Sequence, residues 1–216
     1  ILRSLLGLPS YEKRLPKPFE YDENECIASA DLTGTEYNEN QTAPGKIAII
    51  CHMFHADLTD EFINYFRQIP YRFDLFITTS EKNLQFLRDP FRQELPDVHT
   101  TMFALPNYGR DVAPFLYILE KYLKEYELAC KVHTKKSGHD KNLEDWRRYL
   151  LDQLLGNPSI VHRITGAFLE NEKLGLIWPL PHPYLKHMDI DLGWGPDFSK
   201  EHNFQAAKQF FHDLEL

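Results

Sequence analysis

Two short polar clusters in this sequence carry the residue types that bind a phosphate or a similar anion. Residues 107–111 read Asn-Tyr-Gly-Arg-Asp, and residues 131–137 read Lys-Val-His-Thr-Lys-Lys-Ser. A glycine permits a positive φ or a close backbone approach, an arginine offers a planar fork of donors, and lysines and hydroxyls add charge and further donors. The candidate anion-binding residues of the two clusters are Asn107, Gly109, Arg110, Lys131, Lys135, Lys136 and Ser137.

The second cluster differs in charge from the rest of the chain. Residues 131–148 contain six cations and three anions, a net charge of +3, whereas the whole chain has a net charge of −8. Side chains alternate along a strand, so Lys131 and His133 should share one face while Val132 packs on the other. Thr134 and Ser137 add hydroxyls directly afterwards. The alternative interpretation is a solvated charged face that binds nothing.

The first cluster also has a purely structural interpretation. Asp111 stands where a helix begins, so its carboxylate is placed to cap that helix. Arg110 is placed to pair with Asp111 instead of with a ligand. Both interpretations stay open at this point.

Several familiar catalytic and metal-binding motifs are absent from the sequence. There is no phosphate-binding P-loop, no dinucleotide fingerprint and no nucleophile elbow, and no Cys-x-x-Cys or His-Glu-x-x-His suggests zinc. His52, His55 and His133 could form a three-imidazole metal site, although each could equally have other partners. Asp189 and Asp191 have metal-binding spacing but follow the last clear strand. No metal site is therefore predicted.

The elements that must position these residues alternate between strands and helices. Apolar runs predict strands near 47–54, 73–79, 100–105, 128–132 and 174–178. Helices are predicted after Asp57, Ser80 and Asp111, from about Asn142, from Asn157 to Phe168, and over 203–212. This order predicts an α/β fold with a mostly parallel, twisted, Rossmann-like sheet and helices on both faces. Ligands of such sheets bind at the carboxyl ends of the strands, where both clusters lie.

Length and composition limit the classes of protein. The 216 residues suit one α/β domain, the acidic balance argues against a nucleic-acid binder, and no apolar run approaches the ~20 residues needed to cross a bilayer. Three scattered cysteines indicate buried thiols in a reducing cytoplasm. We predict a linker or irregular segment of a larger protein at 1–45, the α/β domain at 46–178, and the start of a truncated acceptor-side region at 179–216.

Three motifs occur in the order Asn-Tyr-Gly-Arg-Asp-Val-Ala-Pro-Phe, Lys-Val-His-Thr-Lys-Lys-Ser and Asp-Trp-Arg-Arg-Tyr-Leu-Leu. With these motifs the sequence resembles the rhamnan synthesis protein F family. The resemblance covers roughly 46–216. It implies a GT-A-like glycosyltransferase that transfers a sugar, rhamnose among the candidates, from a nucleotide-sugar to a growing bacterial cell-surface polysaccharide. The implied partners are the nucleotide-sugar as co-substrate with no other cofactor, a glycan or lipid-linked glycan acceptor, and other domains of the parent chain. The implied location is the cytoplasm, with peripheral association at the inner face of the plasma membrane.

The resemblance assigns provisional roles to the candidate residues. Lys135, Lys136 and Arg110 would lie near the diphosphate, because Lys-Val-His-Thr-Lys-Lys stands where GT-A enzymes carry Asp-x-Asp. The remaining candidates are Asp111 or His133 as the base, His52, His55 and Asp57 as pocket-lining residues, and Thr78 and Thr79 as nucleoside contacts. One alternative is a non-catalytic glycan- or nucleotide-binding module of an assembly protein. Another is a metal hydrolase that uses the three histidines.

Overall fold

The computed structural model describes residues 44–107, 109–136, 141–180 and 182. In this part of the chain four parallel strands form one sheet in the order β3-β2-β1-β4. The strands are β1 Ile47–His52, β2 Asp74–Thr79, β3 His99–Ala104 and β4 Leu128–His133. The helices are η3 Ala56–Leu58, α2 Thr59–Phe66, α3 Glu81–Glu94, α4 Val112–Tyr122, η4 Leu123–Glu125, η5 Lys141–Leu143, α5 Trp146–Leu155 and α6 Pro158–Glu170. The predicted α/β class and parallel sheet are confirmed.

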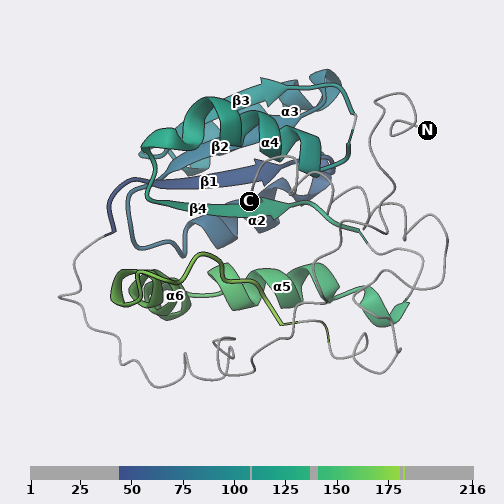
Figure 1. Ribbon diagram of the computed structural model, residues 1–216. Coiled ribbons are helices and arrows are strands. Elements are labelled where there is room, and N and C mark those ends of the chain that lie inside the picture. The colour runs from purple at the N-terminus through teal and green to yellow at the C-terminus, as the bar shows by residue number, and fades with distance from the viewer. Residues whose placement is uncertain (1–43, 108, 137–140, 181, 183–216) are drawn as a thin grey trace, which may run out of the picture. The chain divides into compact units, whose positions relative to one another are not determined.

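The two faces of the sheet are covered by different helices, because the strand side chains alternate between them. Ile49 and Cys51 point into a core that contains side chains of α2, α3, α5 and α6. Ala48 and Ile50 point into a second, smaller core that contains α4. Figure 1 shows α4 crossing the front of the sheet with α3 behind it. This double covering explains why β1 is an unbroken apolar run.

The order of the strands creates a switch point between β1 and β4. The chain runs from β1 to β2 and β3 with α2 and α3 on one face, then returns along α4 on the other face to place β4 beside β1. His52 and His133, the last residues of these two strands, are paired in register. The strand order changes direction between β1 and β4, and ligands of open α/β sheets bind outside the carboxyl ends of the strands at such a point.

The predicted fifth strand is wrong, because residues 174–178 form no strand. A strand that continues the sheet beyond β4 with a right-handed crossover needs its preceding helices on the α4 face. Instead α5 and α6 pack on the α2 and α3 face, so a parallel strand here would require a left-handed crossover. The segment remains outside the sheet, with Leu176 and Trp178 68% and 59% exposed.

Most helices begin near the predicted residues, but only some of the predicted capping hydrogen bonds form. Asn157 caps α6 as predicted, its side chain accepting from the backbone N of Ile160 at 3.0 Å. Asp111 and Ser80 occupy cap positions without a cap hydrogen bond from their side chains. Asp57 lies inside η3, and α2 begins only at Thr59. The two aspartates fail as caps because lysines hold their carboxylates.

Two further predictions are tested only in part. The helix expected from about Asn142 begins later, as α5 at Trp146, after the short turn η5. The helix expected over 203–212 and most of the segments 1–45 and 179–216 lie outside the described residues. None of the helices in the described ranges is long and apolar enough to span a membrane.

Candidate functional site

A polar pocket of about 420 Å³ lies at the carboxyl ends of β1 and β4, at the switch point of the sheet. Its lining residues are His52, Phe54, His55, Asn107, Arg110, Asp111, His133, Thr134, Lys135 and Lys136. All of these except Phe54 and Thr134 are site residues predicted from the sequence. The structure therefore brings both polar clusters and the end of β1 to one place, from segments that lie far apart in the chain.

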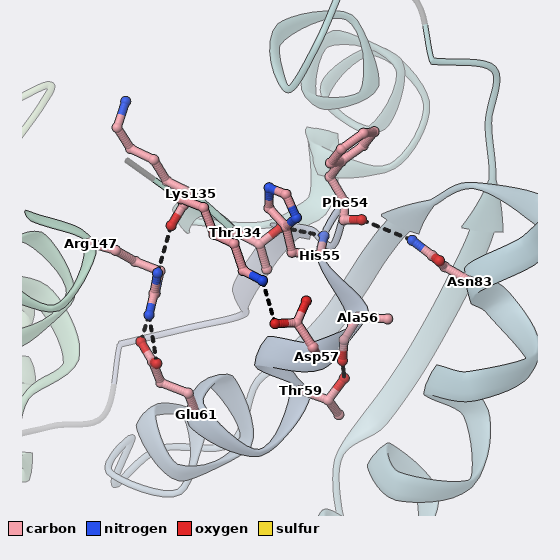
Figure 2. A network of polar contacts seen from close by, with 11 residues as sticks. Phe54, His55, Ala56, Asp57, Thr59, Glu61, Asn83, Thr134, Lys135 and Arg147 are labelled. Carbon is pink, nitrogen blue, oxygen red and sulfur yellow. Dashed lines mark hydrogen bonds and ion pairs between the residues drawn. The ribbon is translucent and has the colours of Figure 1, made fainter. Parts of the chain in front are cut away.

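Thr134 joins the ends of β1 and β4 beneath this pocket. Its backbone N donates to the carbonyl of His52 at 3.0 Å, and its hydroxyl donates to the same carbonyl at 3.2 Å. The hydroxyl also accepts from the backbone N of His55 at 3.0 Å, a contact shown in Figure 2. The side chain is buried. The sequence suggested the Thr134 hydroxyl as a ligand donor, but it is occupied in holding the two loops together.

Thr78 and Thr79 support the pocket from β2 and do not line it. Both side chains are buried, at 0% and 1% exposure. The hydroxyl of Thr78 lies 3.0 Å from Nδ1 of His52, and that of Thr79 donates to the carbonyl of Met53 at 2.7 Å. Both hydroxyls therefore have partners within the protein, and the nucleoside contacts of these two residues stay a prediction. Because β2 is the central neighbour of β1, its end lies under the loop that follows β1.

The two lysines of the loop after β4 have different partners. Lys136 forms an ion pair with Asp57, the residue predicted as a helix cap. The Nζ atom of Lys135 lies 3.9 Å from the ring centre of Trp146, a cation–π distance. Partial burial, together with the charge of Arg110, lowers the pKa of Lys135 below its usual value. Neither lysine forms a buried ion pair, so the ammonium groups of both are available to bind an anion.

Arg147 fixes the backbone of this lysine loop. Its Nε and one Nη donate to the two carboxylate oxygens of Glu61 at 2.7 and 2.8 Å, and its other Nη donates to the carbonyl of Lys135 at 2.6 Å. Figure 2 shows this chain of contacts from α2 to the loop. Both side chains are less than one fifth exposed. Sequence reasoning counted Arg147 only as part of the positive stretch and missed its positioning role.

Asp111 is the centre of a second polar group on the α4 side. Lys131 forms an ion pair with its Oδ2 atom, and Nδ1 of His133 lies 3.5 Å from the same oxygen. Partial burial raises the pKa of Asp111, but the Lys131 hydrogen bond and the adjacent positive charge outweigh that effect, so the net pKa is lowered. Burial lowers the pKa of His133 in spite of the nearby carboxylate. Lys131 and His133 do share one face of β4, as predicted, and Val132 packs in the opposite core.

Gly109 and Arg110 form a turn in which both residues have positive φ, +68° and +52°. The positive φ that the sequence suggested for Gly109 is observed, and a Cβ atom there would lie 2.6 Å from the Cβ of Ala113. A left-handed conformation is unfavourable for arginine. Such strain is found where the surroundings impose a backbone conformation, often at binding sites. The carboxylate of Asp111 already has Lys131 as an ion-pair partner, so it does not depend on Arg110 for its charge to be paired.

The three-histidine metal site proposed as an alternative is not formed. In the described ranges no group of three or more histidine, cysteine, aspartate or glutamate side chains is placed to hold a metal ion. Nδ1 of His52 contacts Thr78, and Nδ1 of His133 faces Asp111. Ser137 and the Asp189–Asp191 pair lie outside the described residues.

The chain is similar to one protein family and to two curated proteins. The family described as "Rhamnan synthesis protein F" matches residues 20–212, a match that begins inside the segment predicted as a linker. Two curated relatives, each described as "Uncharacterized protein WxcX", come from two strains of Xanthomonas campestris pv. campestris. Each is 29% identical over 135 residues, which cover 62% of this chain and 19% of the relative. The matched region thus spans about one fifth of the length of these relatives. No solved structure matches the chain.

Proposed function

This chain belongs to the rhamnan synthesis protein F family, whose members serve polysaccharide synthesis, and from that premise we propose that the switch-point pocket binds a nucleoside diphosphate sugar. The parent protein would transfer the sugar, with rhamnose as one candidate, to a growing cell-surface polysaccharide. The acceptor would be a glycan or a lipid-linked glycan. The work would take place in the cytoplasm, with the protein at the inner face of the plasma membrane.

One observation carries the proposal, namely the convergence of Arg110, Lys135 and Lys136 on one pocket at the switch point. Glycosyl transfer leaves a nucleoside diphosphate, whose growing negative charge must be stabilised in the transition state. Preorganised cations achieve this with little rearrangement. We assign this role to these three cations, which line the same pocket.

The second requirement is a base that removes the proton of the acceptor hydroxyl. We assign this role to His133, because its lowered pKa keeps the imidazole neutral near pH 7. In the reaction Nε2 would take the acceptor proton, the acceptor oxygen would bond to C1 of the sugar, and the bond from C1 to the diphosphate would break. Asp111 is a weaker base, since Lys131 holds it ionised, and would instead orient the imidazole through Nδ1.

Calorimetric titration of the full-length parent with nucleoside diphosphates tests the anion site. The double variant Lys135→Ala, Lys136→Ala should lose at least tenfold in affinity, since each lost charge-assisted contact is worth ~1.5–3 kcal/mol. A matched control is Lys46→Ala, Lys124→Ala, which removes the same charge near the opposite ends of the strands. Wild-type affinity should also fall with added salt. Equal affinities for the two double variants would refute the assignment.

Turnover of the bound donor distinguishes a glycosyltransferase from a non-catalytic binding module. Release of the diphosphate from a nucleotide-sugar by the parent, and its loss in His133→Gln with donor binding preserved, would support transfer. Tight binding without any turnover or transfer would support a non-catalytic glycan- or nucleotide-binding module in a larger assembly protein.

A further inference from the structure

Among the described residues that line the switch-point pocket, Phe54 is the one large apolar side chain. It is 46% exposed, while its neighbour Met53 is fully buried. The other lining side chains are polar or charged. An exposed aromatic ring beside a set of cations and imidazoles adds nothing to phosphate binding, so its place in the pocket needs another explanation.

The exposure of Phe54 does not come from a loose loop. The backbone N of Met53 donates to the carbonyl of Thr78 at 2.8 Å, and the hydroxyl of Thr79 donates to the carbonyl of Met53 at 2.7 Å. On the other side, Asn83 donates to the carbonyl of Phe54 at 2.9 Å, as Figure 2 shows. The backbone of the loop is thus held by the end of β2 and the start of α3, which fixes the point from which the ring projects.

The histidine that follows adds to this arrangement. The ring of His55 packs edge-on against Phe54, with a centre-to-centre distance of 5.0 Å and an interplanar angle of 90°. The backbone N of His55 is held in turn by Thr134. Partial burial and the charge of Lys136 lower the pKa of His55, so its ring is neutral near pH 7. A neutral imidazole can both donate and accept a hydrogen bond.

We propose that Phe54 is a stacking platform for the base of the nucleoside diphosphate, with His55 at its edge, while Arg110 and the two lysines hold the phosphates. The inference rests on the proposed function and extends it to the part of the ligand that the cations do not recognise. Stacking of a base on an aromatic side chain tolerates different bases, because every base has a planar face. The platform therefore sets affinity for a nucleoside, and residues around the rim would select among bases.

The test compares two probes on the full-length parent by calorimetry, namely inorganic pyrophosphate and the tightest binder among UDP, dTDP and GDP. Phe54→Ala should weaken the nucleotide roughly 5- to 150-fold, the range expected for the loss of one stacked base. It should change pyrophosphate affinity less than twofold. Phe54→Trp should retain nucleotide affinity. Phe86→Ala is the matched control, because Phe86 is 62% exposed on α3 and does not line the pocket.

Each outcome of this test has a distinct meaning. If Phe54→Ala leaves nucleotide affinity unchanged, or weakens both probes equally, the platform is refuted while the anion site can stand. If it weakens a nucleotide-sugar but not the free nucleotide, the ring contacts the sugar and the assignment to the base is wrong. If the wild-type protein binds neither probe, the proposed function fails and this inference fails with it.

Discussion

Replacing Glu61 by glutamine should show how strongly the lysine loop depends on its support. The Glu61 carboxylate accepts two hydrogen bonds from Arg147 and is 19% exposed, with the partner side chain at 12%. Glutamine keeps the size and one acceptor but removes the charge and turns an NH₂ group towards the guanidinium. The loss is one charge-assisted contact in a mostly buried setting, or ~1.5–3 kcal/mol. For a chain of this length that corresponds to a decrease in Tm of roughly 3–12 °C.

The matched control is Glu94→Gln, which changes the same group in an exposed pair. The ion pair between Arg67 and Glu94 has side chains 44% and 49% exposed, and exposed pairs are typically worth less than ~1 kcal/mol. Urea denaturation at pH 7 gives the free energy of unfolding for both variants. A double-mutant cycle with Arg147→Met should give a coupling energy above ~1 kcal/mol for the Glu61 pair.

The same variant carries a functional readout. Arg147 also donates to the carbonyl of Lys135, so a misplaced guanidinium should shift the loop and weaken diphosphate binding together with stability. If Glu61→Gln costs no more stability than Glu94→Gln, the argument from burial is wrong. If it destabilises the protein but leaves diphosphate affinity intact, the pair supports the fold and not the loop.

Four other predictions concern the turn, the carboxylates and the ligand. Gly109→Ala should lower the free energy of unfolding by at least ~1–2 kcal/mol, because of its positive φ and the contact with Ala113. The control Gly175→Ala, with no atom within 4 Å of the added Cβ, should change it by less than ~0.5 kcal/mol, and denaturant melts of both variants check this. Arg110→Lys should keep Tm but weaken diphosphate binding ~10-fold or more, and a large drop in Tm would instead make the residue structural. The hydrogen bonds from Arg147 lower the pKa of Glu61. Its contribution to stability should therefore be complete above about pH 4.3 and be lost as the pH falls through the pKa of Glu61 in the folded protein. Urea midpoints of the wild type and Glu61→Gln between pH 7 and pH 3 measure this contribution. Diphosphate binding should survive a chelator, and loss with EDTA that manganese or magnesium restores would show that a metal is required.

The sequence predicted the strands and most of the pocket because local patterns determine both. β1 is a continuous apolar run and the other strands each contain a shorter one. The polar clusters begin where such runs stop, so the carboxyl ends of β1 and β4 could be identified directly. The order of the strands followed only from the structure. It depends on α4 returning across the sheet, which no local pattern encodes, and it is this return that brings His52 beside His133.

Several errors share one physical origin, since side chains at the ends of elements have several partners within reach. Asp57 and Asp111 have the residue type of caps, but Lys131 of β4 and Lys136 of the loop after β4 pair with their carboxylates. Thr78 and Thr79 end a strand as site residues do, yet β2 is central and its end is covered by the loop after β1. Phe54 was overlooked because the sequence places it inside an apolar run predicted to be buried, whereas β1 ends at His52 and Phe54 is exposed. The segment 174–178 has the composition of a strand, and the handedness of its connection excludes it.

The junction between β1 and β4 also bears on how the protein folds. The hydrogen bonds of Thr134 to His52 and His55 close loops of 82 and 79 residues, whereas β1 and β2 are joined through a single helical connection. Closing a longer loop costs more chain entropy, and contacts distant in sequence slow folding. We therefore expect the β1–β4 pairing to be a late event, with one edge of β1 open while β2 and β3 are already in place. During synthesis on a ribosome, the β4 side of β1 would stay unpaired until the second polar cluster had been synthesised. The pocket would therefore form only when the domain is completely folded.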